Sequence, residues 1–217
     1  MTESVTIALP AGWRKIDAGP NEDSDIAQAV EGAFAGADRD SSAVRKHWMR
    51  ERLKSSLHPS GDVEAEVVSV LYPERTAGGV PLPVSATILR LDLVSDDAEA
   101  AMRTVALLVS EDKDAALLET PAGVLVRTQQ VRDVREAFDQ VVDEAPLSED
   151  EKAEVHATGA ELPTLRVRYV LPAPPGKRWH ALAFSAVLGS DEPELVDNFI
   201  ELFDAFAMTM TPKAAAA

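Results

Sequence analysis

The sequence predicts an α+β fold in which an antiparallel sheet of about six to seven strands is sandwiched by helices, an α/β/α arrangement. Three observations predict this fold class. Runs that alternate apolar and polar residues recur along the chain, which is typical of strands with one buried face. Turns rich in Pro and Gly separate several neighbouring runs, as expected between antiparallel strands. Stretches with apolar residues three or four positions apart favour amphipathic helices.

The first quarter of the chain predicts one strand followed by helical structure. Residues 4–9 alternate in the manner of a strand, and a Pro-Ala-Gly turn follows them. Residues 24–35 carry apolar side chains at every fourth position, which predicts a helix. A second helical stretch at 42–57 follows an Asp-Ser-Ser run at 40–42, which is typical of a helix N-cap. The pattern leaves open whether 24–57 is one interrupted helix or two helices.

The middle of the chain predicts two strands, a helix and a hairpin. Residues 63–72 and 84–94 alternate as strands do, and the apolar centre of the second strand indicates burial on both faces. Residues 96–109 predict a helix that begins at a Ser-Asp-Asp run. Residues 115–119 and 123–132 predict the two arms of a hairpin.

The last third of the chain carries the strongest periodicity. Residues 164–171 alternate between apolar side chains on one face and Arg166 and Arg168 on the other. A Pro-rich turn leads into a partner strand at 178–188. Residues 193–208 then predict an amphipathic helix with acidic residues at its beginning, where they interact favourably with the helix dipole.

Length and composition predict one globular domain. The chain has 217 residues, of which 46% are hydrophobic, so we expect a single domain at 1–211 and a disordered tail at 212–217. It has no cysteine, which excludes thiol catalysis and disulfide frameworks. Its formal net charge of −16 argues against nucleic acid and anionic membrane surfaces as partners.

The N-terminal sequence predicts a cytoplasmic protein. It has no basic stretch followed by a long apolar run, as a signal peptide would, and no lipobox cysteine. No apolar run approaches the roughly 20 residues of a membrane span. The abundance of Ala and Arg is typical of a bacterial protein from a GC-rich genome.

Catalytic and metal-binding motifs are not recognisable in the sequence. The four histidines, His47, His58, His156 and His180, do not have the spacing of a zinc site. No glycine-rich phosphate loop and no nucleophile elbow occurs. We therefore predict no enzyme activity, no cofactor and no metal, with acid–base work by His180 and a nearby carboxylate as a lesser hypothesis.

Two charged segments are candidate partner-binding surfaces. The first is a basic window around Trp48 that comprises Arg45, Lys46, Arg50, Arg52 and Lys54. This window either docks an acidic partner, or its basic face is solvated or pairs with the acidic excursion at 146–161. The second is Glu149, Asp150 and Glu151, within an exposed acidic excursion at 146–161 that follows a short predicted helix at 134–144.

Both ends of the chain resemble one protein family. Residues 7–13, Ile-Ala-Leu-Pro-Ala-Gly-Trp, resemble the opening of PsbP-like proteins. The hairpin formed by 166–171 and 180–187, followed by the helix 193–208, resembles their closing segment. The group includes Ran-binding Mog-like proteins and bacterial LpqN-type lipoproteins. The resemblance implies an antiparallel sheet between helices. It also implies a protein that binds other proteins, and because members of the group share no catalytic residues, no catalytic role is carried over to this chain.

From these observations we expect a non-catalytic protein-interaction module of an accessory, chaperone-like or immunity-type kind. Its partner would be another protein, and the chain itself a monomer or homodimer. The alternative is a small-ligand or lipid-binding module with a pocket between the sheet and the helices.

Overall fold

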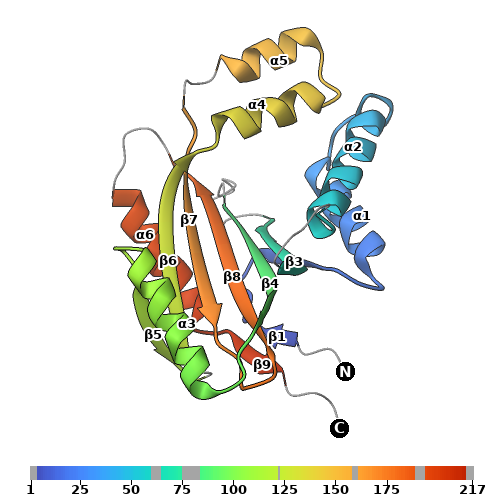
Figure 1. Cartoon of the computed structure of the whole chain (residues 1–217). Coiled ribbons are helices and arrows are strands. Elements are labelled where there is room, and N and C mark those ends of the chain that lie inside the picture. The colour runs from blue at the N-terminus through green and yellow to red at the C-terminus, as the bar shows by residue number, and fades with distance from the viewer. Residues whose placement is uncertain are drawn as a thin grey trace.

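The computed structural model describes residues 4–59, 65–74, 84–121, 123–157, 161–188 and 194–213 (Figure 1). Within these ranges the strands are β1 (Ser4–Thr6), β2 (Trp13–Asp17), β3 (Ala65–Pro73), β4 (Val84–Val94), β5 (Ala116–Thr120), β6 (Gly123–Asp133), β7 (Pro163–Leu171), β8 (Arg178–Val187) and β9 (Thr211–Lys213). The helices are α1 (Glu22–Ala33), α2 (Arg39–Leu57), α3 (Ala98–Glu111), α4 (Arg135–Glu144), α5 (Glu149–His156) and α6 (Glu194–Ala207). None of these described helices is both long and apolar enough to cross a bilayer.

Seven strands form one antiparallel sheet in the order β2-β3-β4-β8-β7-β6-β5, and β1 and β9 form a separate pair. β4 and β8 are paired at the centre although residues 95–177 lie between them in the sequence, so the two halves of the chain meet there. The predicted α+β class and the antiparallel sheet are therefore confirmed.

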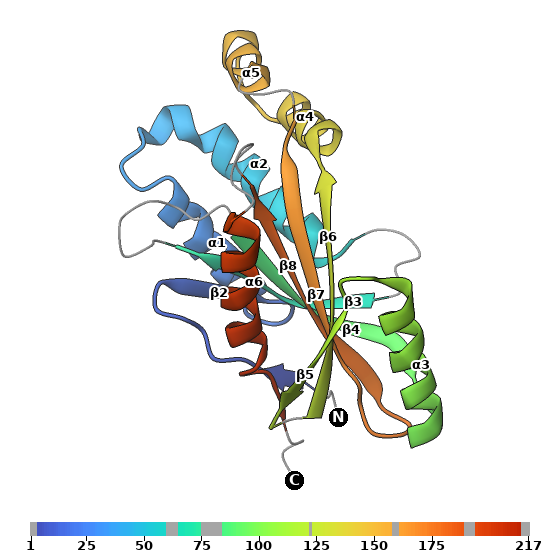
Figure 2. The same ribbon diagram turned by 90° about the vertical axis from the view of Figure 1, so that its left-hand side faces the viewer.

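Helices cover both faces of the sheet because successive residues of a strand point to opposite sides. On β7, Leu165 lies in the core beneath α6, whereas Val170 lies in a second core beneath α3. Figure 2 shows α6 and α3 on opposite sides of the sheet. On β3, Leu71 belongs to the α6 core and Val70 contacts the core built by α1 and α2. α3 and the α1–α2 pair therefore share the face that α6 does not cover.

Aromatic stacking and a half-buried carboxylate hold α6 on its face of the sheet. The rings of Phe184 on β8 and Phe203 on α6 stack with centroids 4.2 Å apart. The Tyr169 hydroxyl donates a hydrogen bond to one carboxylate oxygen of Asp204 at 2.6 Å, and Arg127 donates to the other at 2.6 Å. Burial, reinforced by this hydrogen bond, raises the pKa of Tyr169 above its ordinary value. The amphipathic pattern of the terminal helix thus becomes the cover of the largest core.

Two short strands differ from the prediction. β2, which the sequence did not indicate, follows the Pro-Ala-Gly turn and pairs with β3. β9 pairs with β1 and includes Pro212 and Lys213, the first two residues of the predicted tail. Residues 214–217 lie outside the described ranges. Strands of three to five residues are too short to show a period, and only their pairing partners define them.

The helical segments settle one open question and correct two predictions. α1 and α2 are two separate helices, and Gly36 adopts a positive φ of 87° between them. α2 begins at Arg39, so residues 40–42 lie inside the helix rather than ahead of it. The acidic excursion contains a helix, α5, because Ser148 and Glu151 form a reciprocal capping box at its beginning. The predicted elements at 63–64 and 191–193 lie outside the described residues.

The central strand β4 packs on both faces at its centre, as predicted, because Ile88 lies in the α6 core and Leu89 packs against the cores beneath the α1–α2 pair and α3. Its first half is covered on one face only. Val84, Ala86 and Ile88 are buried in the α6 core. Ser85 is exposed on the other face and Thr87 is half-buried there. This strand therefore alternates, and its polar side chains face the region between α3 and the α1–α2 pair.

We predict that Phe203→Ala lowers the free energy of unfolding by about 3–5 kcal/mol, because it leaves a cavity in the α6 core. The matched control in the same helix is Leu202→Ala. The Leu202 side chain is exposed, so its removal should change the free energy of unfolding by about 0.5 kcal/mol or less. Urea denaturation followed by circular dichroism measures both. Equal losses in the two variants would contradict the assignment of α6 as the cover of this core.

Candidate functional site

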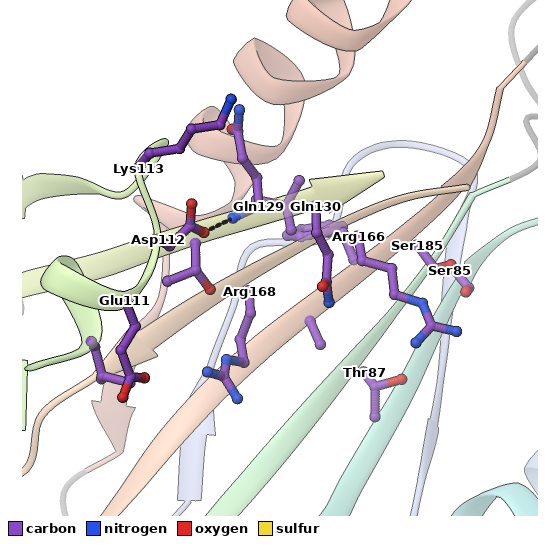
Figure 3. Close-up of a pocket in the computed structure, with 15 residues that line it drawn as sticks. Ser85, Thr87, Glu111, Asp112, Lys113, Gln129, Gln130, Arg166, Arg168 and Ser185 are labelled. Atoms are coloured by element: carbon purple, nitrogen blue, oxygen red, sulfur yellow. Dashed lines mark hydrogen bonds between the residues drawn. The ribbon is translucent and has the colours of Figure 1, made fainter. Parts of the chain in front are cut away.

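A polar hollow lies on the part of the sheet that α3 and the α1–α2 pair leave open (Figure 3). Its volume is about 700 Å³. Strands β4, β8, β7 and β6 form its floor, and the end of α3 forms one side. The polar and charged side chains that line it are Ser85, Thr87, Glu111, Asp112, Lys113, Thr128, Gln129, Gln130, Arg166, Arg168 and Ser185.

The register of the strands explains why these side chains meet. Gln130 pairs with Arg166, Arg166 pairs with Ser185, and Ser185 pairs with Ser85, so four strands contribute to one transverse row. A second row, which runs through Thr128, Arg168, Ala183 and Thr87, lies one pleat away. Directly paired residues share a face of the sheet. The hollow is therefore a product of pairing between segments far apart in the sequence.

The polarity of this face changes abruptly along each strand. Towards α3, the same face carries Val126 on β6, Val170 on β7 and Ala181 on β8, all buried. Two residues further along, these positions become Thr128, Arg168 and Ala183, and α3 no longer covers them. The end of α3 at Glu111 thus marks the boundary between core and hollow.

Arg166 and Arg168 are the distinctive groups of the hollow. Both side chains are exposed, and neither forms an ion pair or hydrogen bond with any residue in the part of the chain that the structure describes. Other arginines are engaged; Arg127, for example, binds Asp204 at 2.6 Å and Arg135 binds Asp139 at 2.8 Å. In a chain of net charge −16, two adjacent arginines without a carboxylate partner are unexpected.

Two acidic side chains also line the hollow, and one of them is already engaged. The Asp112 carboxylate accepts hydrogen bonds at 2.9 Å from the backbone N–H groups of Gln129 and Asp114. Glu111 is exposed at the end of α3. With Lys113 counted beside the two arginines, the lining carries an excess of one positive charge.

The basic window predicted from the sequence is paired within the molecule. Arg45 lies 2.7 Å from Glu151 and Arg52 lies 3.0 Å from Glu144, so α2 is tied to α5 and α4. The remaining pairs are Lys46–Glu31 at 2.6 Å, Arg50–Glu31 at 2.9 Å and Lys54–Asp23 at 2.7 Å. The contact of Arg45 matches the expected pairing with the acidic excursion, whereas Lys46, Arg50 and Lys54 pair with acidic residues of α1 instead. Docking of an acidic partner on this window stays a prediction.

The three acidic candidates at the start of α5 have different surroundings. Glu151 accepts hydrogen bonds from the backbone and side chain of Ser148 and from Arg45, and together these lower its pKa to about 2. Glu149 lies 3.4 Å from Lys152 in the same helix. Asp150 is exposed. The structure brings Glu151 together with Arg45 but does not place any of the three at the hollow.

The histidines lie apart from one another. His58 contacts Glu22 at 2.8 Å, and His180 is buried on β8. His156 joins α5 to α4, because its Nδ1 lies 2.8 Å from Asp139 and its Nε2 lies 3.1 Å from Asp143. Within the described ranges, no group of three or more His, Asp or Glu residues could hold a metal ion.

The hollow itself was not recognised from the sequence, although part of its signal was. The alternation of 164–171 already placed Arg166 and Arg168 on the face away from the core. What the sequence lacked was the pairing of this strand with 123–132 on one side and 178–188 on the other. A polar residue on the second face of a strand flanked by two others is the signal that could have identified the site.

No protein-family model matches this sequence. No curated protein matches it either.

We predict that the pKa of His156 lies above the ordinary histidine value of about 6.5, because its charged ring donates hydrogen bonds to the carboxylates of Asp139 and Asp143, which favour that form. The stabilisation of the α4–α5 contact is then complete below pH 6.5 and is lost as the pH rises through the folded-state pKa. Titration of the ring protons by NMR measures the value. Asp139→Asn should lower it, whereas Glu136→Gln, at an exposed position of the same helix, should not. A pKa at or below 6.5 would contradict this contact.

Proposed function

We propose that this chain is a non-catalytic binding module whose site is the hollow on the open sheet face, and that its ligand is an anion. The observation that supports the proposal most strongly is the pair Arg166 and Arg168, which no described carboxylate neutralises. Residues two positions apart on one strand face lie about 6.7 Å apart along the strand. The two cationic side chains therefore leave neighbouring positions of one strand face, and an anion in the hollow would reduce the repulsion between them.

The other lining groups support the same proposal. Guanidinium groups bind carboxylates and phosphates through charge-assisted hydrogen bonds, which are about twice as strong as neutral ones. The hydroxyls of Ser85, Thr87 and Ser185 line the hollow on the β4–β8 side of the arginines and can donate to an anion. These groups bind and orient a ligand, which is the work of a binding site. The negative charge of the rest of the molecule repels anions at long range. Binding would therefore depend on direct contacts within the hollow rather than on long-range attraction.

A protein partner, the function predicted first from the sequence, is the second candidate. The observation that favours it is a set of exposed apolar side chains on α3 and the neighbouring β5–β6 hairpin, namely Met102, Leu107, Leu117 and Val124. Exposed apolar patches mark protein interaction sites. The PsbP-like and Mog-like relationship, the cytoplasmic location and the monomeric or dimeric state stay predictions of the sequence.

We predict that replacing both arginines, in Arg166→Gln/Arg168→Gln, weakens anion binding at least about tenfold, because each charge-assisted hydrogen bond contributes roughly 1.5–3 kcal/mol. NMR titration of the labelled protein with butanoate and with inorganic phosphate detects binding even when it is weak. In the unmodified chain, the shifts should cluster on β6, β7 and β8.

The matched control is Arg103→Gln, which removes an exposed arginine of α3 that is paired with Glu99. It changes the net charge but not the hollow, so its binding should equal that of the unmodified chain. Equal anion binding by the double variant, or shifts confined to α3 and the β5–β6 hairpin, would contradict the proposed site.

A further inference from the structure

A second cavity lies between α1, α2 and strands β2 and β3, and it is mostly apolar. Its volume is about 570 Å³. α2 contributes Met49 and Leu53, and the strands contribute Ile16 and Val70. The facing part of α1 has only small residues, Ala29, Gly32 and Ala33, which leave the space unfilled.

The apolar cavity and the polar hollow share a wall residue, Ser85. One transverse row of the sheet also joins them. Ile16 pairs with Val70, Val70 with Thr87, and Thr87 with Ala183, which pairs with Arg168. The row therefore runs from the apolar cavity to a hollow arginine. Three strand spacings separate β3 from β7, a distance of about 14 Å.

We propose that the polar hollow and the apolar cavity form one site for an aliphatic carboxylic acid. The carboxylate binds Arg166 and Arg168, and the acyl chain lies beneath α1 and α2. This inference rests on the proposed function and names the ligand class. The excess of one positive charge in the hollow matches a monoanion. Apolar lining at one end and cationic lining at the other match a molecule that is apolar at one end and charged at the other.

The lining of the apolar cavity suits a slender apolar tail. The polar groups that border the apolar cavity are at its edges: Tyr72 is half-buried, and burial raises the pKa of its hydroxyl, so that it stays neutral. Glu74 is held by Arg14 at 2.8 Å. An acyl chain would thus meet Ile16, Met49, Leu53 and Val70, while its carboxylate lies beyond Ser85.

The first test compares butanoate, hexanoate, octanoate and decanoate by isothermal titration calorimetry on the full chain. Affinity should rise up to about fourfold with each added methylene that enters the cavity. The neutral probe 1-decanol should bind at least about tenfold more weakly than decanoate, because it does not offer a charge to the arginines. Equal affinities for butanoate and decanoate would overturn the inference.

The second test fills the cavity. A Cβ added at Gly32 would lie 3.6 Å from a carboxylate oxygen of Glu74, an ordinary contact, so substitution there is tolerated. Gly32→Leu should abolish the gain in affinity with chain length and leave butanoate binding unchanged. Gly32→Ala, the matched control, adds one methyl group and should retain most of the gain. Circular dichroism confirms folding, and the chain-length series on the unmodified protein remains decisive if Gly32→Leu does not fold.

The variants also separate this inference from the proposed function. If the double arginine variant binds every acid of the series equally weakly, and affinity in the unmodified chain does not depend on acyl length, only the aliphatic part of the inference is overturned. If affinity follows chain length but ignores the arginines, the anion site itself is contradicted, and with it the placement of the carboxylate.

Discussion

The packing of α6 on the sheet is the interaction on which the rest of the structure depends. Phe203 stacks on Phe184, and Asp204 receives hydrogen bonds from Tyr169 and Arg127. This contact covers one face along the four central strands and most of their buried aromatic side chains. Because strand residues alternate between faces, everything that the chain does not bury under α6 must appear on the other face.

That other face is covered in two separate pieces. α3 seals the part around Trp179 and Val170, and the α1–α2 pair seals the part around Ile16 and Val67. The region between them keeps polar side chains, since neither cover reaches it. The basic residues Arg45 and Arg52 of α2 form ion pairs with α5 and α4 of the same chain. Among the cations that line the hollow, Arg166 and Arg168 form no ion pair within the described residues and are available to a ligand.

The sequence predicted the parts of the fold that have a strong period. The strands at 84–94 and 164–171 and the terminal helix were recognised because their apolar residues repeat over three or more periods. β2, β9 and α5 were missed or misplaced, since each is short and depends on a partner or a cap. The candidate site could be predicted only in part. Arg166 and Arg168 were placed on the correct face, but the pairing of four strands and the small residues of α1 are tertiary facts that local patterns do not contain.

A crystal structure of the chain with 10-bromodecanoate tests the central claim most directly, because the anomalous signal of bromine locates the far end of the ligand. The account predicts carboxylate density within hydrogen-bond distance of Arg166 and Arg168. It also predicts a bromine peak between α1 and β3, beside Gly32 and Val70. A ligand bound with its carboxylate away from both arginines, or bound only to the exposed apolar side chains of α3, would contradict the account.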